Sequence, residues 1–549
     1  MRLVIRDYLL QLKEKDELDL LLCDLLLQMG YVVDNTPKSG NRQFGVDIQA
    51  HNRNELLLFV VKQKTIDRRT WDSDPNSVRQ SINEILDTYL IRLPESMLRR
   101  EIHIVVATNG NIDETVRPSW DGFVKQNTNW NNIPLRIDFW GIDEITCYVE
   151  KHLFDEHLFP AEQQSRLRKA LYFIGENDYK HGFYEQIIDS YLSYAKEALQ
   201  KTGEKKKREF SKCMAGMFLS IQMISAYAQN EKRYRIAIEA NEYLIIRYWK
   251  LMLEEELFAK EKYCDWLLKF CKKYEEANNL YYSSIRNICE NRELFPKYYS
   301  GLERRFMLYE VLGYLATYAV YCIPHLPTQA QDITNTIIKL INDHEELPYV
   351  PLDSMIGTVS ILFSLFSLLG KEKDLRELYK YYVATLMAWY RNSQKHPSAA
   401  DTFRDALDIE MGNQHESYES SGLWGYFLLW LYALDMSELY DEVKCFIEED
   451  LKDTTKCVWY LRPEEEYLFY DAHAMNLSGE GLAIDAQKKY ESFKAIMNYI
   501  AQRYAKDVFS FDTFSFPALE MIVCRYYGYV PRVPVNIELQ NKKKEKPEV

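Results

Sequence analysis

The chain has 549 residues and a formal net charge of −14, with 47% hydrophobic and 27% charged residues. This composition is ordinary for globular proteins and excludes collagen-like, mucin-like and wholly disordered chains. The acidic balance argues against a surface that coats nucleic acid broadly, so any contact with DNA requires a local basic patch.

Glycine, proline and cysteine usage narrows the fold class and the compartment. The content of 20 Gly and 17 Pro is low for this length, which favours long helices over turn-rich β architecture. The ten Cys are scattered without a CxxC pair, which favours reduced core thiols over disulfides or a zinc site. The most apolar runs, 355–370 and 422–434, are shorter than the roughly 20 residues of a membrane span and predict buried helices. With charges at Arg6 and Asp7 breaking any leader pattern, we expect a cytoplasmic protein outside the membrane.

Residues 1–158 alternate between helical and strand patterns. We predict, in chain order, a helix over 9–29, strands over 31–33, 45–50 and 56–61, a helix over 77–93, strands over 102–107 and 135–140, and a helix over 142–152. The order αβββαβ, followed by a further strand and helix, predicts a mixed α/β domain.

From residue 159 onward the strand signal vanishes, and segment after segment shows helical periodicity with short breaks. We predict a large all-α domain over 159–535 that serves as a sensor or docking region, followed by a disordered tail over 536–549. Residues 225–244 resemble half of a tetratricopeptide unit, but no steady 34-residue period is visible. A helical array and a compact helical domain both remain open.

Three charged residues of the α/β domain stand on its predicted helix and strands. Asp19 lies on the first helix, which ends at Gly30-Tyr31; Asp47 follows Gly45-Val46 on a strand; and Lys62 ends the next strand. Each residue alone also fits a bland interpretation, because Asp19 can face solvent and Lys62 can be a surface lysine.

Together these residues resemble the Mrr-like branch of the PD-(D/E)XK restriction-endonuclease superfamily. That family carries an acidic residue on a helix ending in Gly-Tyr, then Gly-x-Asp on one strand and Gln or Glu-x-Lys on the next. The resemblance covers roughly residues 8–110, where the predicted αβββαβ order matches the family's core. It implies catalytic roles for Asp19, Asp47 and Lys62, with Mg²⁺ held by Asp47 and Asp19. The metal would polarise the phosphate and activate water, while Lys62 would orient the nucleophile or stabilise negative charge.

The sequence departs from the family pattern two residues before the lysine, where Val60 replaces the usual Glu or Gln. A valine can neither bind a metal nor hold a water. Gln63 beside it and Glu84 on the following helix are the alternative polar groups in this stretch. The departure keeps a second function open, in which a degenerate nuclease fold only binds.

Basic residues follow the strand that bears Lys62. Lys64, Arg68, Arg69 and Arg79 are clustered, with Trp71 among them, and backbone contact to DNA is the functional interpretation. A solvated loop is the structural alternative.

These observations lead to two functional hypotheses. The first is a Mg²⁺-dependent DNA endonuclease-like effector of a prokaryotic restriction or anti-phage system, whose helical domain binds a partner protein and which could act as a homodimer. The second is a non-catalytic adaptor that binds DNA or protein. The chain contains no Walker A, GxGxxG or GxSxG motif, which argues against an NTPase, a dinucleotide enzyme and an α/β-hydrolase.

Overall fold

A computed structural model describes residues 2–35, 44–152, 161–175, 182–294, 301–343, 355–393, 403–411, 420–452, 455–460, 466–471, 480–484 and 508–532. The chain divides into an N-terminal unit, Met1–Ala240, and a C-terminal unit, Asn241–Val549. Each unit is described by itself below.

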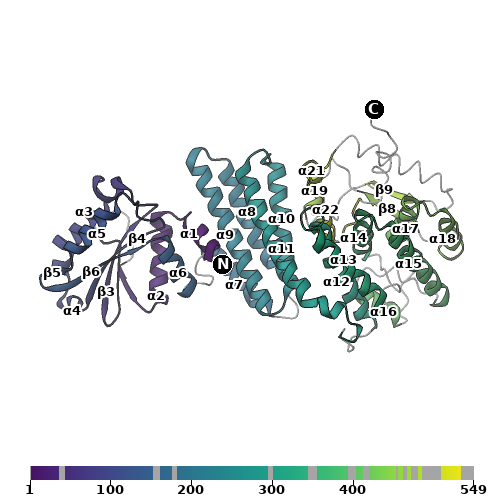
Figure 1. The fold of residues 1–549 in the computed structure, drawn as a ribbon, viewed down its shortest axis with the longest axis horizontal. Helices are drawn as coiled ribbons and strands as arrows, with labels where there is room; N and C mark the ends of the chain where they lie inside the picture. The colour runs from purple at the N-terminus through teal and green to yellow at the C-terminus, as the bar shows by residue number, and fades with distance from the viewer. Residues whose placement is uncertain are drawn as a thin grey trace. The chain divides into compact units, whose positions relative to one another are not determined.

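A six-stranded mixed sheet forms the centre of the α/β region in the N-terminal unit (Figure 1). Its strands are β1 (Val32–Asn35), β2 (Ile48–His51), β3 (Glu55–Lys62), β4 (Glu101–Thr108), β5 (Asn129–Trp130) and β6 (Ile133–Trp140). Their order in the sheet is β1-β2-β3-β4-β6-β5. Strands β3, β4 and β6 are parallel to one another, whereas β1, β2 and β5 pair antiparallel with their neighbours.

Helices cover both faces of this sheet because alternate strand residues point to opposite sides. One face packs Leu58, Val60 and Val106 against an aromatic cluster that includes Trp71 and Trp120. The elements on this side are η2 (Arg69–Ser73), α3 (Val78–Glu84), η3 (Ile85–Tyr89), η4 (Leu90–Arg92), α4 (Glu95–Leu98) and α5 (Arg117–Gln126). The other side carries α1 (Arg2–Leu9), η1 (Glu14–Leu18), α2 (Asp19–Gln28) and α6 (Ile142–His152).

The predicted αβββαβ order is confirmed, with two differences. Sequence analysis missed α5, which supplies the crossover that the parallel strands β4 and β6 require. The single helix predicted over 9–29 is wrong, because the chain breaks between α1 and η1. The break has a tertiary cause: the carbonyls of Leu9 and Leu12 accept hydrogen bonds from the side chain of Asn109 at 3.0 and 2.8 Å.

Asn109 and its neighbours hold the carboxyl ends of β3 and β4 together. The Asn109 carboxamide oxygen accepts from the Lys64 backbone N–H at 2.8 Å, and the Thr108 hydroxyl donates to the Lys64 carbonyl at 2.5 Å. A Cβ at Gly110 would lie 2.2 Å from the Lys64 carbonyl carbon, so only glycine fits there. The Gln63 side chain adds a bond of 2.9 Å to the Leu12 carbonyl.

The rest of the N-terminal unit is helical. It contains α7 (Ala161–Ile174), α8 (Gly182–Leu199) and α9 (Gly203–Asn230), and α10 (Tyr234–Glu254) begins within it. Helix α9 packs against α7, α8 and α1. The Tyr191 ring lies against Gly216 of α9, with ring atoms 3.0 Å from where a Cβ would stand.

The C-terminal unit is mostly helical, as expected. Beyond α10 its helices are α11 (Glu261–Cys289), η6 (Arg292–Leu294), α12 (Gly301–Cys322), α13 (Pro327–Asp343), α14 (Ile356–Leu368), α15 (Glu372–Ser393), α16 (Phe403–Glu410), α17 (Gly422–Ala433), α18 (Ser437–Asp450), α19 (Glu466–Phe469), α21 (Ser510–Thr513) and α22 (Ala518–Tyr527). The apolar runs 355–370 and 422–434 form the buried helices α14 and α17, as predicted. Helix α11 has 29 residues, and α9 of the N-terminal unit has 28. Helices of this length leave no room for a second helix in a 34-residue tetratricopeptide unit.

The all-α prediction for residues 159–535 is wrong at one place. Strands β7 (Ser420–Ser421), β8 (Thr455–Tyr460) and β9 (Glu480–Ile484) form a three-stranded sheet. The β8 sequence TKCVWY is rich in β-branched and aromatic residues, which favour a pleated strand. The predicted tail over 536–549 lies outside the described residues, and no described helix is long and apolar enough to cross a membrane.

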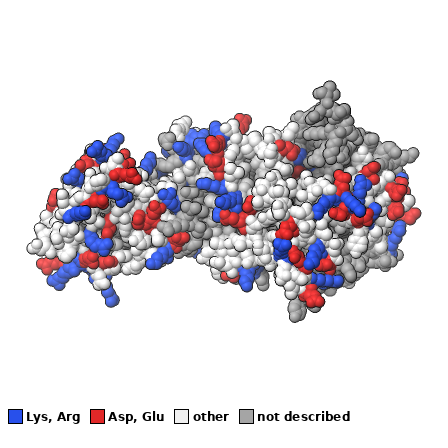
Figure 2. All heavy atoms as spheres, viewed as in Figure 1, with Lys and Arg blue, Asp and Glu red and all other residues white. Residues whose placement is uncertain are grey.

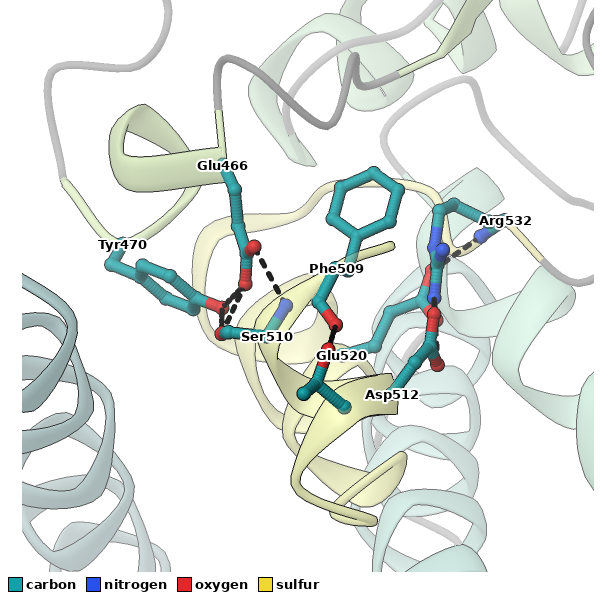
Figure 3. A network of polar contacts seen from close by, with 8 residues as sticks. Glu466, Tyr470, Phe509, Ser510, Asp512, Glu520 and Arg532 are labelled. Atoms are coloured by element: carbon teal, nitrogen blue, oxygen red, sulfur yellow. Dashed lines mark hydrogen bonds and ion pairs between the residues drawn. The ribbon is translucent and has the colours of Figure 1, made fainter. Parts of the chain in front are cut away.

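A buried polar network anchors the segment that contains α21 (Figure 3). The Glu466 carboxylate accepts the Ser510 backbone N–H at 2.8 Å. Arg532 donates to Glu520 at 3.0 Å and to Asp512 at 3.1 Å, and its guanidinium lies 4.0 Å from the Phe509 ring centroid. Burying a charge is costly unless it is paired, so breaking these bonds would be unfavourable. The network therefore holds together segments of the C-terminal unit that are distant in sequence.

The Asn109 side chain generates a stability prediction. Replacing Asn109 with Ala should lower the free energy of unfolding by about 2–4 kcal/mol, because each buried polar group left unsatisfied costs about 1–3 kcal/mol. Urea unfolding measures the free energy of unfolding, and hydrogen exchange of the β3 amides measures the local protection of this strand. Asn83→Ala, at an exposed position of α3, is the control and should change stability by no more than about 0.5 kcal/mol. Equal protection of β3 in both variants would contradict this role of Asn109.

Candidate functional site

Asp47 is fixed at the carboxyl end of β3. Its backbone N–H donates to the Phe59 carbonyl at 2.8 Å, and its Oδ2 accepts the Val61 backbone N–H at 2.8 Å. The glycine before it is required by geometry, because Gly45 has φ +82° and a Cβ there would lie 2.2 Å from the Ser81 carbonyl oxygen. The Gly-x-Asp sequence thus brings the Asp47 carboxylate beside the strand that ends in Lys62.

Charged side chains from two elements surround Asp47. Burial raises the pKa of the Asp47 carboxyl, and the negative charge of Glu14 raises it further, while the Val61 N–H, Lys62 and Lys15 act in the opposite direction. Lys62 is half-buried, and its side chain forms no hydrogen bond or ion pair with any described residue. A buried carboxylate with a raised pKa beside an unpaired lysine is typical of functional sites, although structural clusters also produce it.

Glu14 is the carboxylate that sequence analysis missed. It opens η1, the π-helical turn that follows the break after α1, and its charge acts on Asp47. π-Helical turns occur frequently at functional sites. The signal was hidden, because the break that directs Glu14 toward β2 and β3 depends on Asn109, almost a hundred residues further along the chain.

Asp19 is the other acidic residue for which the sequence predicts a role at the metal. It is 4% exposed at the start of α2, and its Oδ1 accepts the Leu20 backbone N–H at 2.7 Å. Its charge acts on Cys23, whose pKa is raised to about 12, mainly by burial. Asp19 is not among the principal charges that shift the pKa of Asp47, so the shared metal site predicted for the two residues gains no support.

The residues around the missing third position have structural roles. Val60 is fully buried in the core beneath α3 and α5. The Gln63 amide donates to the Leu12 carbonyl, which also accepts a hydrogen bond from Asn109. Glu84 ends α3 and makes no hydrogen bond or ion pair within the described part of the chain.

Two of the four cations in the predicted DNA-binding patch already form ion pairs with aspartates. Arg69 pairs with Asp74 at 2.9 Å and Arg79 pairs with Asp72 at 3.1 Å. Lys64 and Arg68 are exposed and form no side-chain ion pair with described residues. Acidic and basic side chains are interspersed over the visible face of the N-terminal unit (Figure 2).

Trp71 is unavailable for stacking on a base. It is 3% exposed and packs edge-on against Trp120 and Phe123, with ring centroids 5.7 Å apart in each pair. The patch therefore offers cations for phosphate contacts and no aromatic platform from Trp71.

The metal-binding capacity of the site is limited. Among the described residues no group of three or more His, Cys, Asp or Glu side chains is arranged to hold a metal. Asp47 and Glu14 supply two carboxylates, which suits Mg²⁺ that keeps several waters and also binds substrate phosphate. The donor set does not suit zinc, which takes Cys and His ligands with three or four protein contacts.

Comparisons with models of protein families, with curated proteins and with solved structures found no match for this chain. The assignment of the site therefore depends on its geometry and on the resemblance of its sequence motifs.

The raised pKa of Asp47 predicts that its ionised carboxylate lowers the free energy of unfolding at neutral pH. A carboxyl whose pKa is higher in the folded state loses stability as pH rises from its ordinary value of 3.8 through the folded pKa, and the loss persists at neutral pH. Asp47→Asn retains an oxygen for the Val61 N–H and removes the buried charge. Its melting temperature should therefore exceed that of the wild type at neutral pH, and the difference should shrink as the pH is lowered.

Thermal melts across the acid-to-neutral range measure this difference. Asp87→Asn, at an exposed position of η3, is the matched control and should follow the wild-type profile. An Asp47→Asn protein that is less stable than the wild type at neutral pH would contradict the proposed environment of Asp47.

Proposed function

We propose that the α/β region is a nuclease-like module that cleaves DNA phosphodiesters with the help of Mg²⁺. The observation that carries the proposal is the buried Asp47 carboxylate, which accepts the Val61 N–H on the strand that ends in Lys62. The charges of Glu14 and Lys62 both act on this carboxylate. Carboxylates can hold a divalent metal ion, and a lysine can stabilise the negative charge that develops during phosphodiester hydrolysis.

The chain's own residues would divide the chemistry as follows. Asp47, held by the Val61 N–H, would orient one oxygen toward the metal, and Glu14 would supply a second carboxylate or hold a metal-bound water. When bound, Mg²⁺ would polarise the phosphate and increase the acidity of water. Lys62 would stabilise the negative charge that develops on the phosphate oxygens, since its side chain forms no ion pair with the residues that the structure describes.

Substrate contact would come from the exposed cations that follow β3. Lys64 and Arg68 are the members of the patch with free charge, so they should dominate phosphate contact. Arg69 and Arg79 would first have to exchange Asp74 and Asp72 for phosphate oxygens. Such contacts position DNA without reading its sequence.

Specific observations favour the second candidate, a non-catalytic adaptor. Val60 is part of the hydrophobic core, and the neighbouring Gln63 is committed to a backbone carbonyl, so the usual third polar group is missing. In this alternative the fold binds DNA or protein and the helical units bind a partner protein. For either function, the sequence resemblance suggests a role in prokaryotic restriction or anti-phage defence, and double-strand cleavage would call for a homodimer.

Plasmid cleavage tests the leading proposal. The wild-type chain should nick or linearise supercoiled plasmid in the presence of Mg²⁺ or Mn²⁺. Asp47→Asn and Lys62→Met should each reduce the rate by about 100-fold or more, because removing one group that stabilises transition-state charge typically costs that much.

Asp87→Asn controls for the loss of an acidic residue at the surface of the same region and should cleave like the wild type. DNA binding without cleavage by the wild type, and unchanged in Asp47→Asn, would overturn the nuclease proposal and favour the adaptor. Equal cleavage by all the variants would point to a contaminating nuclease and would equally contradict the assigned site.

A further inference from the structure

An apolar groove of about 430 Å³ lies in the C-terminal unit, where side chains of α13, α14 and α15 meet. It is lined by Ile338 and Ile341 of α13, by Phe366 of α14 and by Leu378 and Tyr381 of α15. Phe366 is 2% exposed, whereas Tyr381 is 51% exposed. The groove is therefore an apolar surface that a further segment of polypeptide can cover.

The charged residues that line this groove are both acidic. They are Asp374 and Glu377, near the start of α15, and no described Lys or Arg lines the groove. Glu377 pairs with Lys380 at 3.2 Å, whereas Asp374 is exposed and forms no hydrogen bond or ion pair with the residues that the structure describes. The groove thus complements a segment that is apolar along one stretch and basic beside it.

Residues 533–549, which follow the last described residue of the C-terminal unit, have this composition. An alternating apolar stretch is followed by a lysine cluster: Val533, Val535, Ile537 and Leu539, then Lys542, Lys543, Lys544 and Lys546. Such alternation is typical of an extended segment with one apolar side. The prediction of a disordered tail over 536–549 is compatible with docking, because disordered segments can become ordered where they bind.

The start of this segment lies within reach of the groove. Arg532 is held by Glu520 and Asp512 (Figure 3). Just before it, the Tyr529 carbonyl oxygen lies 2.6 Å from where a Cβ of Gly357 would stand, at the beginning of α14. Phe366 lies about 14 Å further along the same helix, at a rise of about 1.5 Å per residue. The stretch 533–539, which spans up to about 23 Å when extended, is long enough to cover this distance.

The segment that joins α13 to α14 fits the groove less well. Residues 344–354 carry Glu345, Glu346 and Asp353 and contain no Lys or Arg. Their charges would repel Asp374 and Glu377, whereas the lysines of the C-terminal segment would attract them.

We propose that residues 533–539 occupy this groove within the same chain, with the lysines that follow placed beside Asp374 and Glu377. The apolar side of the segment covers Phe366 and Tyr381, and the lysines compensate the acidic start of α15. This docking is independent of cleavage at Asp47.

Site-specific photo-crosslinking of the full chain tests the proposal. Tyr381→p-benzoylphenylalanine places the reactive group at an exposed position of the groove, and mass spectrometry of the digested protein should find its crosslinks within 533–540. The same replacement at Tyr172, which is 70% exposed on α7, is the control and should give no crosslink to this segment. The reciprocal variant Leu539→p-benzoylphenylalanine leaves the groove intact and should crosslink to α13 or α15.

Charge reversal tests the basic part of the contact. Asp374→Lys combined with Glu377→Lys should lower the crosslink yield from Tyr381→p-benzoylphenylalanine about fivefold or more, because attractions become repulsions. Adding Lys542→Glu, Lys543→Glu and Lys544→Glu should restore the yield. Glu372→Lys, at an exposed position in the first turn of α15 outside the groove, is the matched control and should leave the yield unchanged.

Mixing isotopically labelled with unlabelled chains distinguishes one chain from two. Crosslinked peptides in which both halves carry the same label support the proposal, whereas peptides of mixed label would assign the groove to the tail of a second copy and overturn it. Crosslinks from Tyr381→p-benzoylphenylalanine to 344–354 or elsewhere, with none to 533–549, would also overturn it. So would a yield that charge reversal leaves unchanged.

Discussion

The hydrogen bonds from Asn109 and Gln63 to the backbone of the α1–η1 segment are the constraint on which the rest of the N-terminal unit depends. Asn109 alone engages the carbonyls of Leu9 and Leu12 and the N–H of Lys64. These bonds end the first helix early and hold the following turn over the carboxyl ends of β3 and β4. The charge of Glu14 in η1 acts on Asp47, and Glu17 of the same turn pairs with Lys212 of α9 at 2.7 Å.

The buried charge of Asp47 lowers the stability of the fold and serves the proposed function. A carboxylate buried near a second carboxylate is unfavourable in a folded protein unless a cation or a substrate compensates the charge. The Val61 N–H and Lys62 offset only part of this cost, since the pKa of Asp47 is still raised. The same arrangement is what a site for a hydrated divalent ion and a phosphate would need, which is why the nuclease proposal and the destabilising charge have one physical origin.

Much of the fold was predictable from the sequence, because strand and helix periodicity is a local property. The β2–β3 hairpin, β4, β6 and α6 lie where the pattern placed them, and so do Asp47 and Lys62. Glu14 could not be found in this way, since its position depends on a side chain from the distant end of β4. Asp19 lies on a helix as predicted, at the start of α2, and its predicted role at the metal stays a prediction. The pairing of Arg69 and Arg79 with aspartates likewise depends on a turn geometry that spacing does not show.

Binding of Mn²⁺, measured by electron paramagnetic resonance on the full chain without DNA, tests most directly whether Asp47 and Glu14 form one site. The account predicts a specific Mn²⁺ site that is lost in Asp47→Asn, weakened in Glu14→Gln and retained in Asp19→Asn. Mn²⁺ binding that survives Asp47→Asn, or that is lost in Asp19→Asn while Glu14→Gln binds normally, would contradict it.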